Sequence, residues 1–487
     1  MSWALSLRLL AAEDILSVAG LLLLVIGAWT GDRSTRALSW LGVLALAIAG
    51  AVTVPALLTG ASGSEASAFF GQYAADAFSA FAKLLIYVSA AVTLMVAPSF
   101  FGRLGANRAE FPVLVVFAAL GMGLMVAATN LLTLYIGLEM NSLAAYVLAA
   151  MLRSDQRSAE AGLKYFVLGA LASGILLFGM SLTYGFSGTL GFAGIHEAMK
   201  GTLGLGSTFG IVFMLVGLAF KISAVPFHMW TPDVYEGAPT PVTTFFATAP
   251  KVAAMALTMR VTLFAFGPQA HAWQQIVVAV SLASIVWGAL GAIGQTNIKR
   301  LLAYSSINNV GFMLIGLATG TPAGASAVLV YLAIYVAMSL CGFAAVLSLR
   351  DAEGRQVEAI ADLAGLSRTR PGLAAALAMV MFSLAGIPPL FGFWGKFVVF
   401  QAAVQAGLVP LAAIGIAASV IGAFYYLKVV KVAYFDEPAD KVVSTADFTH
   451  GAIMVLSGLF ISPLGYFLTS WLGGLAQSAA SALFHTA

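Results

Sequence analysis

The sequence predicts an all-α integral membrane protein with about fourteen transmembrane helices, and three observations carry this prediction. Hydrophobic residues make up 61% of the 487 residues and charged residues 9%, with a mean hydropathy of +0.98, whereas about a quarter of a soluble domain is charged. No Asp, Glu, Lys or Arg occurs between Arg260 and Lys299, or between Arg300 and Arg350. Each interval is long enough for a membrane helix of about 20 residues. The apolar runs lack the alternation of a membrane β-barrel.

Clusters of Gly, Pro and charged residues divide the apolar runs into helices. In chain order the helices are expected near 12–30, 37–58, 76–97, 110–128, 131–152, 160–184, 207–228, 240–266, 273–294, 299–319, 325–348, 371–400, 407–431 and 452–473. The first run has no small-residue cleavage site after it, so we expect an anchor helix and not a cleaved signal peptide. The longest hydrophilic stretches, 350–370 and 432–451, are loop-sized, so we expect no soluble domain.

The distribution of positive charge supports this count, because Lys and Arg concentrate in cytoplasmic loops. With fourteen spans, the loops on one side carry only Arg8 and Lys200. The loops on the other side carry Arg33, Arg36, Arg103, Arg108, Arg153, Arg157, Lys299, Arg300, Arg350, Arg355, Arg368, Arg370, Lys428, Lys431 and Lys441. We therefore expect both termini to face away from the cytoplasm.

Composition excludes several kinds of cofactor and partner. The single cysteine, Cys341, excludes a cysteine-ligated iron–sulfur cluster, a redox pair and an internal disulfide. The five histidines are scattered without helical pairing, which argues against a haem or zinc site. The net charge of +3 is small and evenly spread, so no nucleic acid partner is expected.

Two segments share a proline-interrupted helix with a lysine nearby: FKISAVPFHMWTP at 220–232 and AGIPPLFGFWGKF at 385–397. A second pair of similar segments, TNLL at 129–132 and TNIK at 296–299, is separated by a similar offset near 165 residues. We therefore expect two inverted five-helix repeats, 110–266 and 267–431, after a three-helix segment, 1–109, and before a cytoplasmic loop and last helix, 432–487. Broken helices paired across repeats indicate an ion path near the membrane midplane, although prolines also simply kink packed membrane helices.

Four ionisable residues lie deep in these apolar helices: Glu139, Lys221, Lys251 and Lys396. Each would cost about 2.5–3.5 kcal/mol at the centre of a membrane helix, so hydrophobic packing gives no reason for them. Glu139 lies on one polar helix face with Ser142, and a pair between Glu139 and Lys221 would keep both charged. The chemistry that fits is proton or cation transfer, and the alternative is a structural charge.

Other charged residues give weaker signals. Lys164 lies one turn past Glu160, so it either reaches the membrane surface or takes part in transfer. His228, after the first proline break, is a second weak candidate for proton relay. We expect Arg260 to reach the outer interface and Lys83 to form an outer salt bridge with Asp76.

A turn is the simplest interpretation of TPDVYEGAPTP, so we expect Asp233 and Glu236 to be solvated.

These stretches together resemble the N-type antiporter-like membrane subunits of proton-pumping NADH:quinone oxidoreductase, respiratory complex I. The resemblance covers nearly the whole chain. It is most specific in LKYFVLGALASG (163–174), FHMWTPDVYEGAPTPVTTFFATAPKVA (227–253), TNIKRLLAYSSINNVGFMLIG (296–316) and AGIPPLFGFWGKFVVF (385–400). A lysine at 396 followed by Phe397 resembles the N type, whereas M-type siblings typically have glutamate there.

The resemblance implies proton-translocation roles for Glu139, Lys221, Lys251 and Lys396, and it adds Lys164. It implies a non-redox subunit of an enzyme in a bacterial inner membrane. FMN, iron–sulfur clusters and quinone would belong to other subunits. The implied partners are the antiporter-like M and L types, the small K, J and A subunits, membrane lipids and protons.

Two alternatives remain open. The first is a subunit of a multi-subunit Na⁺/H⁺ antiporter of the Mrp type, which shares the broken helices. The second is a scaffold whose charges only hold subunits together, so that neutral substitutions would disturb assembly and leave the protons moved per electron unchanged.

Overall fold

The protein was analysed as a computed structural model that describes residues 3–201, 204–439, 441–443 and 447–484. The described chain is almost entirely helical, as the sequence predicts. Its helices are α1 (Trp3–Leu9), α2 (Ala11–Thr30), α3 (Thr35–Thr59), α4 (Ala77–Arg103), α5 (Glu110–Ala127), α6 (Leu131–Ala149), α7 (Gln156–Ser187), α8 (Phe192–Ala198), α9 (Leu205–Ile222), α10 (Trp230–Gly237), α11 (Thr240–Ala247), α12 (Ala249–Met259), α13 (Ala270–Ile293), α14 (Ile298–Ala318), α15 (Pro322–Ser348), α16 (Leu366–Thr369), α17 (Pro371–Ala385), α18 (Phe391–Gln405), α19 (Val409–Phe435), α20 (Phe448–Ile461) and α21 (Thr469–Phe484).

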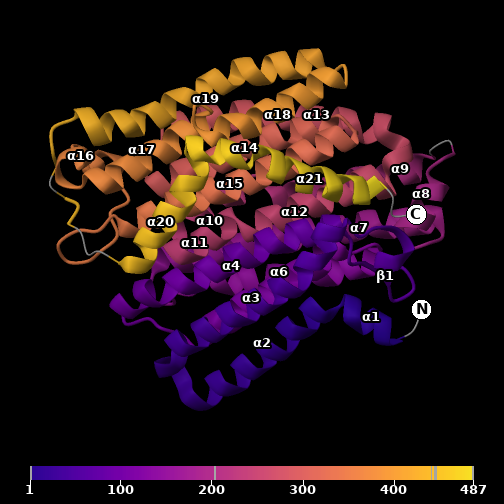
Figure 1. The fold of residues 1–487 in the computed structure, drawn as a ribbon, viewed down its shortest axis with the longest axis horizontal. Helices are drawn as coiled ribbons and strands as arrows, with labels where there is room; N and C mark the ends of the chain where they lie inside the picture. The colour runs from indigo at the N-terminus through magenta and orange to yellow at the C-terminus, as the bar shows by residue number, and fades with distance from the viewer. Residues whose placement is uncertain (1–2, 202–203, 440, 444–446, 485–487) are drawn as a thin grey trace.

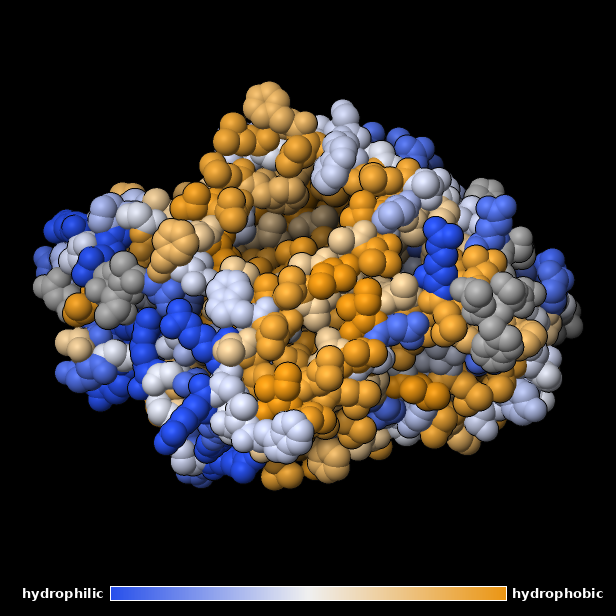
Figure 2. Space-filling view, turned by 60° about the horizontal axis from the view of Figure 1, so that its bottom comes forward, coloured by the Kyte–Doolittle hydropathy of each residue, from blue (hydrophilic) through white to orange (hydrophobic). Residues whose placement is uncertain are grey.

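The helices run roughly along the long axis of the molecule (Figure 1). Both ends of the chain lie at one end of this axis, and α16 with the loop before it lies at the other. On the face shown in Figure 2, hydrophobic side chains fill the middle and hydrophilic ones gather toward the two ends. This arrangement is that of a membrane protein whose helices cross the bilayer along the long axis.

Within the described residues, eleven helices are long and apolar enough to cross a membrane, or up to twelve if the bent pair α20–α21 is one span. The predicted fourteen segments all contain helix, but they do not map one to one onto these spans. Helices α2 and α3 run on as one 49-residue stretch from Ala11 to Thr59, and α17 is a shorter apolar helix. Helices α2 and α3 count as one stretch because only a single 3-10 turn, Gly31–Ser34, joins them.

Two expected continuous helices are interrupted. The predicted 240–266 helix breaks at Thr248, whose backbone φ of −121° and ψ of −87° separate α11 from α12, and it ends in a π-helical turn, Arg260–Ala265. The predicted 452–473 helix is also interrupted, and its predicted bounds were wrong. It begins at Phe448, bends by 63° beyond Ile461 and continues to Phe484. Pro463, which cannot continue the hydrogen bonding of α20, begins the 3-10 turn at this bend.

Both proline-broken helices are present where the sequence predicts them. Helix α9 ends at Ile222 and α10 begins at Trp230, with Pro226 between them, while α17 ends at Ala385 and α18 begins at Phe391. A proline lacks the backbone N–H that would continue the helical ladder. Each break therefore leaves carbonyl groups at the end of α9 and of α17, inside the protein.

The segment between α3 and α4 also contains two short strands that the sequence does not indicate, β1 (Ser67–Ala68) and β2 (Tyr73–Ala74). They pair antiparallel with Ser67 opposite Ala74.

Two buried ion pairs involve residues of the first helices, and these pairs correct two expectations. Arg260 does not reach the surface: it is fully buried and donates to both oxygens of Asp76, at 2.8 and 2.9 Å. Lys83 therefore pairs with Glu13 instead, at 2.6 Å, and Tyr73 donates to the same carboxylate. Losing one partner of such a buried pair destabilises a protein by about 3–5 kcal/mol.

The most buried helices are α11, α12, α14 and α15, so the centre of the molecule lies along them. Helices α9, α10, α17 and α18 surround this centre and bring both breaks toward it.

Candidate functional site

Lys221 lies in the last turn of α9, just before the first break. Its Nζ donates to Ser142 Oγ of α6 at 2.8 Å and to Ser173 Oγ of α7 at 3.3 Å. Both hydroxyl groups are buried. The lysine is thus held by neutral oxygens from two neighbouring helices.

Glu139 does not form the direct ion pair with Lys221 that the sequence suggests, since no salt bridge within 4.0 Å joins them in the described chain. Glu139 lies on α6, one helical turn from Ser142, so it shares the face that holds the lysine. Its buried Oε1 has no hydrogen-bond partner among the described residues. Glu139 acts on Lys221 through its charge and not through a direct contact.

Lys251 lies on α12 and is 3% exposed. Its Nζ donates to Ser223 Oγ at 2.8 Å and to the carbonyl of Ile222 at 3.3 Å. Ile222 is the last residue of α9, and Ser223 adopts a left-handed conformation that ends this helix. The partial negative charge at a helix C-terminus favours a cation at this position.

Both lysines therefore lie at the same end of α9, because Lys221 is in its last turn and Lys251 binds its last carbonyl. Aromatic rings surround the space beside them. The Trp230 ring stacks on Tyr165 with centroids 4.4 Å apart. It lies 6.0 Å from Lys251 Nζ, close to the limit of a cation–π contact.

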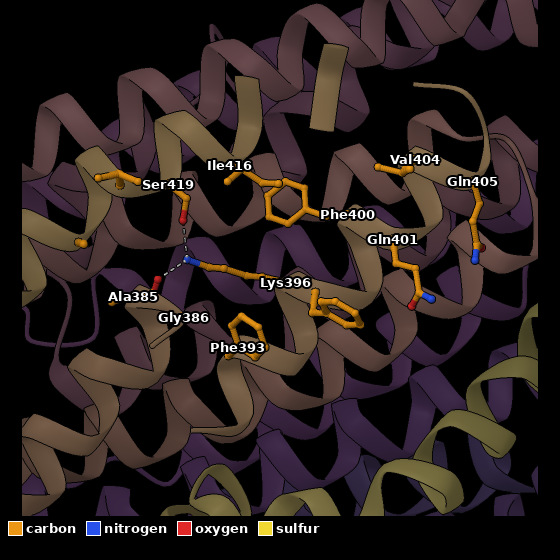
Figure 3. A pocket seen from close by; sticks show the side chains of 13 residues that line it. Ala385, Gly386, Phe393, Lys396, Phe400, Gln401, Val404, Gln405, Ile416 and Ser419 are labelled. Atoms are coloured by element: carbon orange, nitrogen blue, oxygen red, sulfur yellow. Dashed lines mark hydrogen bonds between the residues drawn. The ribbon is translucent and has the colours of Figure 1, made fainter. Parts of the chain in front are cut away.

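Lys396 occupies the second break in an equivalent way. It lies on α18, is 6% exposed, and donates to the carbonyl of Ala385 at 3.0 Å and to Ser419 Oγ of α19 at 3.4 Å (Figure 3). Ala385 is the last residue of α17, as Ile222 is of α9. The next residue, Gly386, has a φ of +83°, a backbone conformation that favours glycine, and it lies directly against the Lys396 side chain.

A neutral polar cluster between α14, α15 and α19 was missed by sequence reasoning. Tyr331 donates to Asn309 Oδ1 at 2.6 Å, and the Asn309 amide donates to the Ser305 carbonyl at 2.7 Å. Ser305 Oγ and Tyr426 share a hydrogen bond of 2.5 Å. The Tyr331 ring packs where Gly395 has no side chain, beside Lys396. The run of serines and asparagines at 305–309, inside a charge-free helix, was the available signal.

Lys164 belongs to a network of opposite charges at the end of the molecule that carries α16. It bonds Asp233 at 2.6 Å and Glu160 at 2.7 Å, and Arg300 bonds Asp233 at 2.6 Å. Asp233 is therefore an ion-pair partner, and the expectation of a solvated turn was wrong. Partial burial raises the pKa of Asp233, but hydrogen bonds from Lys164 and Arg300 outweigh it and lower that pKa below its ordinary value.

Glu236, which was also expected to be solvated, bonds Arg300 at 3.0 Å in the same network. Glu358, in the loop after α15, bonds Arg157 at 2.8 Å and Lys299 at 3.3 Å. Burial raises the pKa of Glu358, and the charges of these two partners lower it below its ordinary value. The network thus ties α7, α10, α14 and this loop together.

His228 lies in the first break with its Nδ1 buried and without a hydrogen-bond partner among the described residues. Its ring lies edge-on to Trp287, with centroids 6.1 Å apart. No contact with Lys221 or Lys251 is seen in the described chain. The described residues also contain no group of three His, Cys, Asp or Glu side chains that could hold a metal ion.

Comparisons with known proteins identify relatives over nearly the whole chain. The family described as NADH:quinone oxidoreductase/Mrp antiporter, TM, matches residues 128–422. NADH-quinone oxidoreductase subunit N of Erythrobacter litoralis is 64% identical over 479 residues, which cover 98% of each chain.

Among solved structures, a chain of respiratory complex I from Thermus thermophilus has a TM-score of 0.81 and 33% identity, over 96% of this chain and 99% of that one. A chain of the Mrp complex from Dietzia sp. has a TM-score of 0.79, over 99% of this chain and 98% of that one. Its identity is 23%, so this likeness concerns the fold alone.

Proposed function

The chain belongs to the NADH:quinone oxidoreductase/Mrp antiporter family of membrane subunits, and from this premise we propose that it carries protons across a membrane as the N-type subunit of NADH:quinone oxidoreductase. The resemblance read from the sequence is confirmed at the level of the family. The proton-carrying residues are the ones that the sequence singles out: Glu139, Lys221, Lys251 and Lys396, together with Lys164 in the charge network.

One observation carries this proposal. In the described chain, Lys221, Lys251 and Lys396 form hydrogen bonds only to hydroxyl groups and to carbonyls of broken helices, and none has a carboxylate within 4.0 Å. Burial without an opposite charge disfavours the ammonium form, while the surrounding oxygens favour it. Opposing effects of this kind make both protonation states accessible. A structural lysine would instead have a permanent carboxylate partner, as Lys83 has in Glu13.

In the proposed mechanism, a signal from a neighbouring subunit changes the charge or position of Glu139. Lys221 then passes its proton toward Lys251, its neighbour at the end of α9. Lys396 exchanges the proton with the far side. The polar cluster offers the hydroxyl groups of Ser305, Tyr331 and Tyr426 and the amide of Asn309 between the two breaks. Moving each charge against the membrane potential requires about 2.3 kcal/mol per 100 mV.

The topology that fits this mechanism has fourteen spans, with two inverted repeats at 110–266 and 267–431 between a three-helix segment, 1–109, and a last segment, 432–487. Asn130 and Asn297 support it. Each caps the helix that follows, α6 or α14, and forms an antiparallel bridge to a later loop, at Gly191 or Ala359. These loops lead to α8 and α16, which lie at opposite ends of the molecule (Figure 1).

The chain is a multi-span membrane protein related to bacterial respiratory subunits, and other complex I subunits are its partners. We place both termini on the periplasmic side of the inner membrane because the loops at the opposite end carry most of the Lys and Arg. The proposed neighbours are the M and L types and the small K, J and A subunits, together with membrane lipids. FMN, iron–sulfur clusters and quinone would be held by other subunits.

Replacing Lys251 by Met tests this function. In inside-out membrane vesicles, NADH oxidation and acidification are measured per assembled complex. Lys251→Met should slow both, and Lys200→Met, at an exposed lysine paired with Glu197, should slow neither. Normal turnover and normal pumping in Lys251→Met would refute the proposal. Loss of assembly with an unchanged ratio of protons to electrons would favour the scaffold alternative.

The Mrp-type antiporter alternative predicts that different subunits purify with this chain. Purification of the intact complex with flavin- and iron–sulfur-containing subunits supports the oxidoreductase assignment. Purification with neither, together with NADH-independent Na⁺/H⁺ exchange, would support the antiporter.

A further inference from the structure

A cavity of about 720 Å³ opens between α18 and α19, with Lys396 at its inner end (Figure 3). Its walls are mainly apolar and include Phe393, Phe400 and Ile416. At its outer rim, Ile416 is 51% and Val420 is 70% exposed. Such a volume lies within the range of about 300–1,000 Å³ typical of ligand sites.

The charge at the inner end of this cavity has no counterion in the described chain. Lys396 Nζ contacts the Ala385 carbonyl, Ser419 Oγ and the face of the Phe312 ring, whose centroid lies 4.5 Å away. All three partners are neutral. An ammonium group in an apolar site is stabilised strongly by an anion, because a charge-assisted hydrogen bond is about twice as strong as a neutral one.

We propose that this cavity binds a long-chain carboxylic acid from the membrane, with its carboxyl group on Lys396 Nζ and its chain between α18 and α19. A permanent anion would have to cross hydrocarbon to reach the lysine, at a high energetic cost. A carboxylic acid enters neutral and transfers its proton on arrival: R–COOH and the Lys396 amine become R–COO⁻ and the ammonium. The single chain fits a cavity with apolar walls and one cation.

The bound carboxylate would hold Lys396 in its protonated form. If Lys396 exchanges protons during each cycle, a consequence that rests on the proposed function, the acid slows pumping. Binding itself does not depend on that function, since it requires only the cavity and the cation. An experiment can therefore refute acid binding at the cavity without refuting the proposed proton transfer, and the reverse.

Binding is measured on the intact complex with a photoreactive long-chain carboxylic acid and with a photoreactive alcohol of the same chain length. The acid should label peptides of α18 or α19, and an excess of the unmodified acid should remove the labelling. Ile416→Trp should abolish it, because the larger ring blocks the outer rim of the cavity. Ile414→Trp is the matched control, because Ile414 lies on the same helix, is 50% exposed and does not line the cavity.

Several outcomes would overturn the proposal. Equal labelling by acid and alcohol would show a merely hydrophobic groove. Labelling that survives Ile416→Trp would place the acid elsewhere. No labelling of the intact complex would mean that a neighbouring subunit covers the cavity.

Inhibition of pumping provides the second readout. The acid should slow acidification at about tenfold lower concentration than the alcohol, since a charge-assisted bond is worth at least that factor. The difference should disappear in Ile416→Trp and persist in Ile414→Trp. Labelling without inhibition would support acid binding in the cavity but refute the role of Lys396 in pumping. Inhibition that is unchanged in Ile416→Trp would exclude this cavity as its cause.

Discussion

Replacing Ser142 by Ala should remove the shorter of the two hydrogen bonds that hold Lys221, that of 2.8 Å. A hydrogen bond to a charged group contributes about 1.5–3 kcal/mol. Because 1.4 kcal/mol corresponds to a factor of ten, the balance between charged and neutral Lys221 shifts toward the neutral form by about 10- to 150-fold. If each cycle begins with a protonated Lys221, turnover should fall several-fold near neutral pH and partly recover in more acidic buffer.

The assay is NADH oxidation and acidification in inside-out vesicles over a range of pH, normalised to assembled complex. Ser158→Ala is the control, because Ser158 is equally buried and bonds the Ala149 carbonyl at 2.8 Å without contacting a lysine. Ser142→Thr keeps a hydroxyl group and should restore most of the activity. The reasoning fails if Ser142→Ala has the pH profile of Ser158→Ala.

Three further predictions concern the other charges of the site. Lys221→Ala should slow turnover and pumping in an assembled complex, and adding Glu139→Gln should make little difference, since residues of one unit are non-additive; losses that multiply in the vesicle assay would show two independent roles. Lys396→Glu should impair pumping more than Lys396→Arg, which keeps the charge; equal damage would mean that deprotonation of Lys396 itself is required. Because the pKa of Asp233 is lowered in the folded protein, its contribution to stability is present above its ordinary value of 3.8 and is lost as the pH falls through the lowered one. Asp233→Asn should therefore lower the thermal stability of the complex at pH 7 and remove this acid-dependent part, and an unchanged pH dependence of unfolding would contradict the assignment.

The sequence predicted the breaks and the buried lysines because both are local properties. Pro226 and Pro388 end a helix wherever it packs, and a lysine such as Lys251 is conspicuous in an apolar run of any tertiary structure. Both of these signals can be read without knowing any neighbour.

The partners of these residues could not be read in the same way. Opposite charge suggested a Glu139–Lys221 pair, yet the rotation and tilt of α6 against α9 bring Ser142 to the lysine instead. Asp233 seemed solvated because its partners, Lys164 and Arg300, lie 69 and 67 residues away.

Such contacts depend on crossing angles, which a helical pattern does not contain.

The association of a lysine with each broken helix has a common physical cause. A helix that ends inside hydrocarbon leaves carbonyl groups that no water can satisfy. Lys251 and Lys396, each from a helix that follows the break, donate to the last carbonyl of α9 and of α17. An ammonium group has three N–H donors, and the neutral amine still has two. The carbonyl therefore keeps its hydrogen bond when the proton leaves, so the break remains intact in both states of the lysine. A residue that must be repeatedly protonated and deprotonated in a membrane is best placed where neither state leaves the backbone unsatisfied.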